Sequence, residues 1–182
     1  MSEQIEKYLQ RKQENLTNSL NTCTIAEILS IEPKYMRADI KLLTGDEDII
    51  MQVPISPQQT GDFIMRMPYK IGDTVLVVFS QSDIDPFLFG GGDSSERQHA
   101  EDDAIIVGGI RSFNDPLPNV FAEHEEDFII AKRDLSARIV IKNNGEISIE
   151  SDESISINSL KDINISAPNG IVTTTDSRGG AE

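Results

Sequence analysis

The sequence predicts a mainly β protein with a short N-terminal helix, a small barrel, and a β-helix in which three chains intertwine. Two observations carry this prediction. Short apolar and β-branched runs, separated by Gly, Pro and Asp turns, fill residues 22–111. An eight-residue repeat with isoleucine at fixed places fills residues 138–175.

Composition limits the classes of function. The 182 residues include 31 acids and 16 bases, for a net charge of −15. This charge disfavours binding to nucleic acid phosphates or to an anionic membrane. Cys23 is the only cysteine, which excludes an intrachain disulfide framework and a Cys-rich zinc site. We expect no transmembrane helix, because no apolar run approaches the length that spans a membrane, and no signal peptide, because residues 2–20 are largely polar.

Residues 1–21 are predicted to form an N-terminal helix. Good helix formers dominate residues 2–20, and Gly and Pro are absent there. The apolar stripe is too thin for an independent coiled coil. The helix either packs on its own domain or serves as a docking arm for another protein.

Residues 22–111 are predicted to form a small β domain. The expected strands are 22–33, 34–43, 47–56, 70–80 and 103–110, with a further strand ending in FLFGGG at 87–92 and a loop at 57–69. A five-stranded barrel of this length fits an OB-fold-like domain. The absence of Trp and the 5% aromatic content disfavour a platform on which bases or sugars stack.

Residues 112–137 are predicted to be a connector. They contain Pro116, Pro118 and an acidic run at 123–127. Four apolar residues are expected to anchor the connector: Phe113, Leu117, Phe121 and Phe128.

The repeat at 138–175 predicts short I-x-I strands separated by polar turns. Isoleucine recurs every eight residues in two registers: Ile139, Ile147, Ile155, Ile163 and Ile171, then Ile141, Ile149, Ile157 and Ile165. Residues i and i+2 of a strand share a face, so both isoleucines of each unit point the same way. Ser148, Ser156 and Asn164 are expected on the opposite face.

The nine isoleucines on one side of the predicted strands must be buried against another surface. A flat meander would leave a large apolar patch exposed. Three chains wound about one axis would bring the nine isoleucines together as a trimer-axis core, with residues 176–182 as a tip or tail. The alternative is an ordinary antiparallel sheet that packs on the preceding domain.

The stretch from Val53 to Arg111 resembles a known family. VPISPQQTGDF, YKIGDTVLVVFSQSDIDPFLFGGG and RQHAEDDAIIVGGIR are similar to the N-terminal OB domain of central spike and baseplate assembly proteins of contractile phage tails. That family's layout is also barrel, connector, trimeric β-helix and tip. The resemblance implies a homotrimer at the baseplate hub that leads the tail tube through the cell envelope when the sheath contracts. Tail-like bacteriocins and injection particles use equivalent spikes.

The chain departs from this family at its tip. Some spikes end in His-x-His motifs that bind an iron, whereas the only histidines here, His99 and His124, precede the repeat. We therefore expect no metal and no cofactor, and a tip that is either frayed or capped by a separate protein. Neither histidine has a second ligand at metal-binding spacing, so both are expected to be ordinary loop residues.

Other candidate sites have simpler explanations. Asp83 and Asp85 form either a catalytic carboxylate pair or a turn, and the turn is favoured. The acidic runs 46–48 and 101–103 lack calcium-loop spacing and are expected to be solvated. The glycines at 90–92 lack the Lys-Ser/Thr of a phosphate loop and are expected to let backbone pass close to backbone.

The leading hypothesis is a non-enzymatic central spike, present in a virion or tail-like particle and assembled in the host cytoplasm. Its expected partners are two further copies, baseplate hub proteins and, transiently, the target envelope, with no nucleic acid. The alternative is an OB-fold module that binds oligosaccharide or single-stranded nucleic acid and uses the repeat as an oligomerisation stalk. A wall hydrolase is disfavoured because no catalytic pair is evident.

Overall fold

The computed structural model describes residues 5, 7–8, 22–45, 47–170 and 172. The chain divides into two compact units, Met1–Pro116 and Leu117–Glu182. The helix predicted over 2–20 lies outside the described residues, apart from Ile5, Lys7 and Tyr8, which are helical. None of the described helices has the length and apolar character that a membrane crossing requires.

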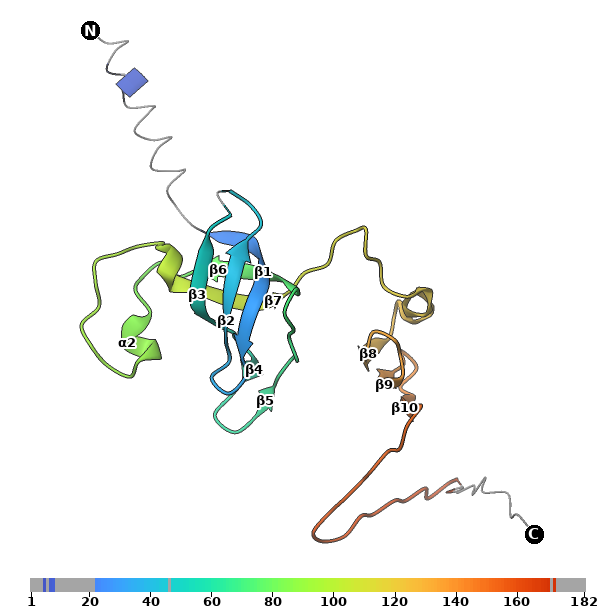
Figure 1. The fold of residues 1–182 in the computed structure, drawn as a ribbon. Helices are drawn as coiled ribbons and strands as arrows, with labels where there is room; N and C mark the ends of the chain where they lie inside the picture. Colours follow the sequence, from blue (N-terminus) through green and yellow to red (C-terminus); the bar gives the residue numbers. More distant parts are fainter. Residues whose placement is uncertain (1–4, 6, 9–21, 46, 171, 173–182) are drawn as a thin grey trace. The chain divides into compact units, whose positions relative to one another are not determined.

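The first unit is built on one curled five-stranded antiparallel sheet (Figure 1). The strand order is β3-β2-β1-β6-β7, so β1 lies at the centre. The five strands are β1 (Cys23–Glu32), β2 (Arg37–Leu42), β3 (Ile49–Pro54), β6 (Thr74–Phe79) and β7 (Ala104–Gly109). Register shifts within three of the strand pairs help the sheet to curl.

The two outer strands of this sheet meet beyond the end of β3. Ile55 forms a parallel bridge with Ile106. The Ser56 amide donates to the Ile106 carbonyl at 2.9 Å, and the Ile55 amide donates to the Met36 carbonyl at 2.7 Å. This strand order and contact fit the expected OB-like barrel in the form of a curled half-barrel.

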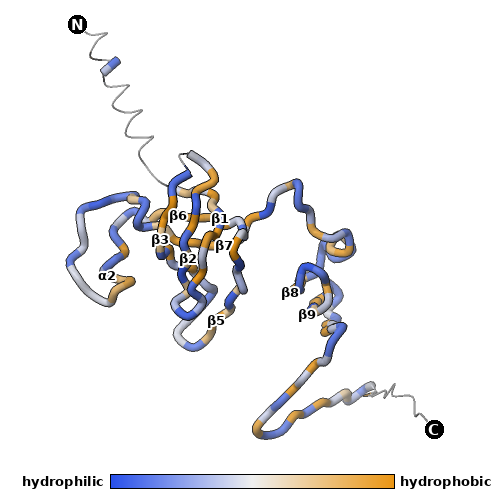
Figure 2. Tube along the Cα trace, in the orientation of Figure 1, coloured by the Kyte–Doolittle hydropathy of each residue, from blue (hydrophilic) through white to orange (hydrophobic). Residues whose placement is uncertain are grey.

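The core of the first unit lies inside the curl. Apolar residues alternate along the strands, as in Val75, Val77 and Phe79 of β6, and each of these is buried. Ile28 of β1, Ile40 of β2 and Ile106 of β7 are fully buried. Figure 2 shows the same concentration of hydrophobic residues along β1, β6 and β7. The alternation that predicted the strands therefore also identifies the core face.

Two details of the first unit differ from the prediction. FLFGGG does not end a strand, because Asp85–Leu88 form the short helix α2, which has Pro86 in its first turn. Proline is well suited to that position because its missing N–H needs no partner there. The expected loop at 57–69 also contains a small hairpin, with β4 (Gln58–Gln59) paired to β5 (Ile64–Met65).

The second unit holds a three-stranded antiparallel sheet with order β10-β9-β8. A 3₁₀ helix, η2 (Asn119–His124), precedes its strands. These are β8 (Phe128–Ala131), β9 (Ala137–Ile141) and β10 (Ile147–Ser151). The first of the strands therefore begins inside the predicted connector.

Beyond β10 the single chain has no further strand among the described residues. Every residue from Asp152 to Gly170 is exposed. The strands expected at 155–157 and 163–165 are therefore absent here, because no neighbouring strand is available to pair with their backbone groups. Figure 2 shows hydrophobic and hydrophilic residues alternating along this extended segment.

Candidate functional site

Arg97 is the centre of a charged cluster in the first unit. Its Nη2 lies 2.7 Å from Asp83 Oδ1, 2.9 Å from Asp85 Oδ2 and 2.9 Å from Asp103 Oδ1. Its Nε donates to Asp103 Oδ2 at 3.0 Å. Arginine thus binds Asp103 through two parallel hydrogen bonds, an arrangement that fixes direction as well as distance.

Backbone amides complete the coordination of these carboxylates. The Ile84 amide donates to Asp103 Oδ1 at 2.9 Å, and the Ser95 amide donates to Asp83 Oδ2 at 2.8 Å. The Asp85 amide donates to Asp83 Oδ1 at 3.0 Å. The cluster therefore fastens the loop after β6 and the segment before β7 to one another.

Hydrogen bonding keeps the two best-buried carboxylates ionised. The Arg97 hydrogen bond is the main cause that lowers the pKa of Asp103, against the opposing effect of burial. The Ser95 and Asp85 amides lower the pKa of Asp83. A general acid needs the opposite shift. The geometry therefore favours the turn interpretation of Asp83 and Asp85 over the catalytic pair.

The burial of Asp103 contradicts the expectation that all of residues 101–103 are solvated. Its side chain is fully buried, whereas Glu101 and Asp102 are exposed. A buried carboxylate is stable only when it is paired and hydrogen-bonded, and Arg97 with the Ile84 amide meets that need. The sequence signal was present, since both residues lie in the RQHAEDDAI stretch, but the pairing was not foreseen.

The charged cluster holds a strongly apolar loop. Phe87 and Phe89 are 86% and 75% exposed at α2, and Leu88 is 40% exposed. The Leu88 and Phe89 amides donate to the Ile84 and Asp85 carbonyls. The loop is therefore ordered although its largest side chains face outward, and exposed apolar groups on an ordered loop often mark a contact surface.

The glycines at 90–92 serve a different purpose from the one expected. All three have positive φ, at 75°, 147° and 116°. A Cβ added at any of them would meet no atom of the same chain within 4 Å, so close passage of backbone within one chain is not the reason for glycine, while a close approach at a subunit contact stays a prediction. Glycine is needed here because other residues are strained at these dihedral angles.

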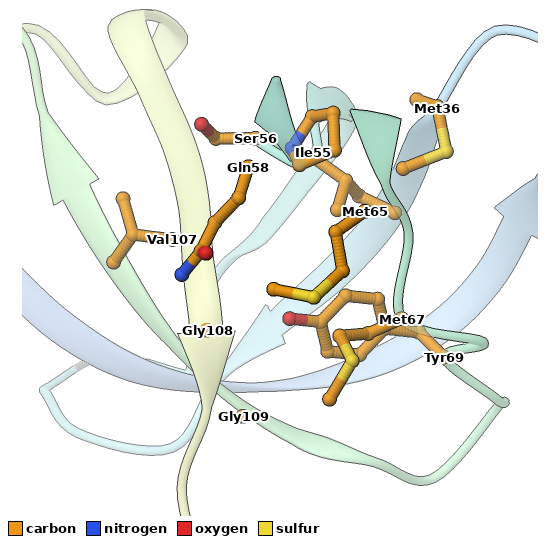
Figure 3. A pocket seen from close by; sticks show the side chains of 11 residues that line it. Met36, Ile55, Ser56, Gln58, Met65, Met67, Tyr69, Val107, Gly108 and Gly109 are labelled. Carbon is orange, nitrogen blue, oxygen red and sulfur yellow. The ribbon is translucent and has the colours of Figure 1, made fainter. Parts of the chain in front are cut away.

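A methionine-rich groove lies beside the seam where the end of β3 meets β7 (Figure 3). It encloses about 200 Å³. Met65, Met67 and Tyr69 follow one another at every second residue, and β7 contributes Gly108 and Gly109 to the opposite wall. These residues lie in the expected loop at 57–69, where the alternation of Met65, Met67 and Tyr69 is a sequence signal of extended structure.

The second unit presents one apolar sheet face. In register across its three strands, Phe128 pairs with Ile141 and Ile141 with Ile147, while Ile130 pairs with Ile139 and Ile139 with Ile149. We call these six residues the isoleucine face. Their exposure runs from 37% for Ile139 to 65% for Ile147. Four of the nine predicted axis residues are thus brought together. Phe128, which was expected to anchor the connector, is instead 60% exposed on this face, and Ile130 was not among the predicted residues.

The opposite face of that sheet is different in character. Val140 is buried there, with 2% exposure, and Ser148 is its neighbour on β10. Arg138 and Glu150 form an ion pair across the same face. The separation of faces expected for the first two repeats is therefore present in the sheet.

Four of the remaining five axis residues lie outside any described strand. Ile155, Ile157, Ile163 and Ile165 are between 51% and 71% exposed, and Ile171 lies outside the described residues. Their membership of a trimer core stays a prediction.

His124 and Glu47 each pair with an oppositely charged or hydrogen-bonding neighbour. His124 Nδ1 lies 2.7 Å from Asp127 Oδ2, and Asp127 also accepts the Asn143 amide, which ties η2 to the turn between β9 and β10. The His124 hydrogen bond lowers the pKa of Asp127. Glu47 pairs with Lys41 at 2.7 Å. Within the described part of the chain, no three His, Cys, Asp or Glu side chains are grouped to hold a metal ion.

Comparison with known proteins gives one family. Residues 17–109 match the family model described as the phage protein Gp138 N-terminal domain. The matched range spans the whole sheet and the Arg97 cluster. A comparison with curated proteins gave no match.

Proposed function

The chain belongs to the family of the phage protein Gp138 N-terminal domain, a phage structural protein family, and we propose that it is the central spike of a contractile tail baseplate. In this proposal three copies form the spike, which helps to pierce the target envelope when the sheath contracts. The observation that carries the proposal is the isoleucine face, which one chain leaves open to solvent.

Burial of that face supplies a reason for association. Full burial of a large apolar side chain stabilises a protein by about 1.5–3 kcal/mol, and these six are already partly covered. The remaining gain is on the order of 5 kcal/mol per chain for the six residues. Three chains around an axis would cover the face on every copy equally, and the continuing repeat would extend the same axis through Ile155, Ile157, Ile163, Ile165 and Ile171.

The proposal assigns the chain partners and a location but no catalysis. The partners are two further copies, baseplate hub proteins, a separate tip-capping protein or a bare tip, and transiently the target envelope. The location is a virion or tail-like particle assembled in the bacterial host. The engaged carboxylates of Asp83, Asp85 and Asp103 support a structural reading of the charged cluster, and the net charge of −15 argues against nucleic acid.

Light scattering on a size-exclusion column tests the proposal with the full chain. The expected mass is three times the 20.1 kDa of one chain. A stable mass equal to one chain would overturn the spike, because the isoleucine face would then need no second copy. That result would favour the alternative, in which the half-barrel is a binding module. Filter binding of single-stranded nucleic acid at low and high salt would then test this alternative.

A further inference from the structure

We propose that the half-barrels of neighbouring copies also bind one another, through a contact separate from the isoleucine face. In this contact the aromatic ridge of one copy, Phe87 to Phe89, enters the methionine groove of the next copy. The inference rests on the proposed homotrimer and names a second surface within it.

The ridge has the properties of an inserting element. Phe87 and Phe89 are among the most exposed large side chains in the described chain, yet α2 and the Arg97 cluster fix the backbone that carries them. An aromatic side chain on a fixed backbone has only two torsion angles to order on binding, so the loss of conformational entropy is small. Aromatic residues are also enriched at the centres of protein interfaces.

The groove has the properties of a receiving element. Met65 and Met67 are 50% and 62% exposed, and they flank the ring of Tyr69 (Figure 3). Methionine side chains adapt to the shape of a guest, and their sulfur atoms make favourable contacts with aromatic rings. Ile55 supplies a buried apolar floor.

The occupant is a second copy because this chain carries both complementary parts. Helix α2, which carries the ridge, and strand β5, which contributes Met65 to the groove, lie apart in the first unit (Figure 1), so we do not expect one copy to fill its own groove. The exposed bases Arg66 and Lys70 are close to the groove residues in sequence, whereas the exposed Asp93 follows the ridge. Opposite charges then meet around an apolar centre, which favours this pairing in a chain of strongly negative charge.

A contact between two different patches of the same chain repeats from copy to copy. Such a head-to-tail contact closes into a ring when the rotation between copies is a simple fraction of a turn. Three copies held together by the isoleucine face would supply that rotation. The half-barrels would then form a closed ring rather than three independent appendages.

Cysteine crosslinking of the full chain tests the contact. Cys23→Ser removes the native exposed thiol, and Phe87→Cys with Met67→Cys places one thiol on the ridge and one in the groove. A short bismaleimide is added, and the products are separated on a denaturing gel. We expect most of the protein in covalent dimers and trimers. The matched control is Phe113→Cys with Met67→Cys, since Phe113 is also a fully exposed aromatic residue in the first unit, and it should give only traces.

The outcomes separate this inference from the proposed function. Light scattering on the uncrosslinked variants reports whether the trimer is present. If the protein is a trimer but the ridge–groove pair crosslinks no more than the control pair, the ridge contact is wrong. The proposed spike would be unaffected by that result. A single-chain mass would overturn both. Both substituted side chains are largely exposed, so neither change is expected to prevent folding.

Discussion

Arg97 and Asp103 form a two-point contact, in which Nε donates to Oδ2 at 3.0 Å and Nη2 donates to Oδ1 at 2.9 Å. The carboxylate is fully buried, and the guanidinium reaches out from it to Asp83 and Asp85. One arginine therefore connects the two ends of the long loop between the paired strands β6 and β7.

Asp103→Asn should destabilise the first unit. The amide cannot accept from both Arg97 nitrogens, and the hydrogen bonds lost are to a charged group, which are worth roughly 1.5–3 kcal/mol. Urea unfolding followed by circular dichroism measures the change. Asp102→Asn is the matched control. The Asp102 side chain is next to Asp103 in sequence but is exposed, so this substitution should change the free energy of unfolding by less than about 0.5 kcal/mol. Equal effects of the two variants would contradict the role given to Asp103.

Acid should weaken the same unit. The pKa of Asp103 and the pKa of Asp83 both lie below their ordinary value of 3.8 in the folded chain. The folded state therefore binds these protons more weakly than the unfolded state. The stability that the two carboxylates contribute is present above the ordinary pKa and is lost as the pH falls through the folded pKa.

The free energy of unfolding should consequently decline below about pH 4, and the decline should be shallower in Asp103→Asn. A urea series at several pH values between about 2 and 6 provides the measurement. Parallel pH profiles for the wild-type chain and the variant would show that Asp103 contributes nothing to the acid sensitivity.

Ile155→Asp should disrupt the proposed trimer. Three copies would place three carboxylates at one level of an apolar axis, and unpaired buried charges cost about 3–5 kcal/mol each. Light scattering should then show a smaller mass or a trimer that dissociates on dilution. Ser156→Asp is the adjacent control on the outer face and should keep the trimer mass. If both variants behave alike, the assignment of faces in the repeat is wrong.

Gly145→Ala should destabilise the turn between β9 and β10. Gly145 has φ of 89°, and no neighbouring atom would contact an added Cβ, so backbone strain alone opposes the change. The left-handed region costs about 1–2 kcal/mol for residues other than glycine. The midpoint of thermal unfolding should fall accordingly. The midpoint of Gly145→Asn should fall less than that of Gly145→Ala, because asparagine tolerates the left-handed region. A larger fall for Gly145→Asn would exclude backbone strain as the cause.

Much of the sheet could be predicted from the sequence. Alternation in β6, with Val75, Val77 and Phe79 facing inward, gives both the strand and its buried face. The eight-residue spacing likewise placed Ile139 and Ile149 on one face, where the strand register puts them. Both successes depend on local periodicity, which a single sequence displays directly.

The buried ion pair, the short helix α2 and the methionine groove depend on contacts that the periodicity of a sequence does not reveal. Asp103 looked like one member of a solvated acidic run, and only its pairing with Arg97 explains how it can be buried. The short apolar run at Phe87–Phe89 fits a strand or a helix equally well, and the preceding Asp-Pro decides for the helix. The methionine groove is formed by segments far apart in sequence, Met36 and Met67 among them, so it emerges only after folding.

The segment from Asp152 to Gly170 is fully exposed in a single chain and forms no strand. Proteases cut most readily where backbone is accessible and extended. A copy that has not found its partners would thus offer its repeat to cellular proteases, while a copy wound into a spike would not. Such selective cleavage would remove unassembled chains and spare assembled particles. The segment proposed to form the trimer axis would then also determine which chains are degraded.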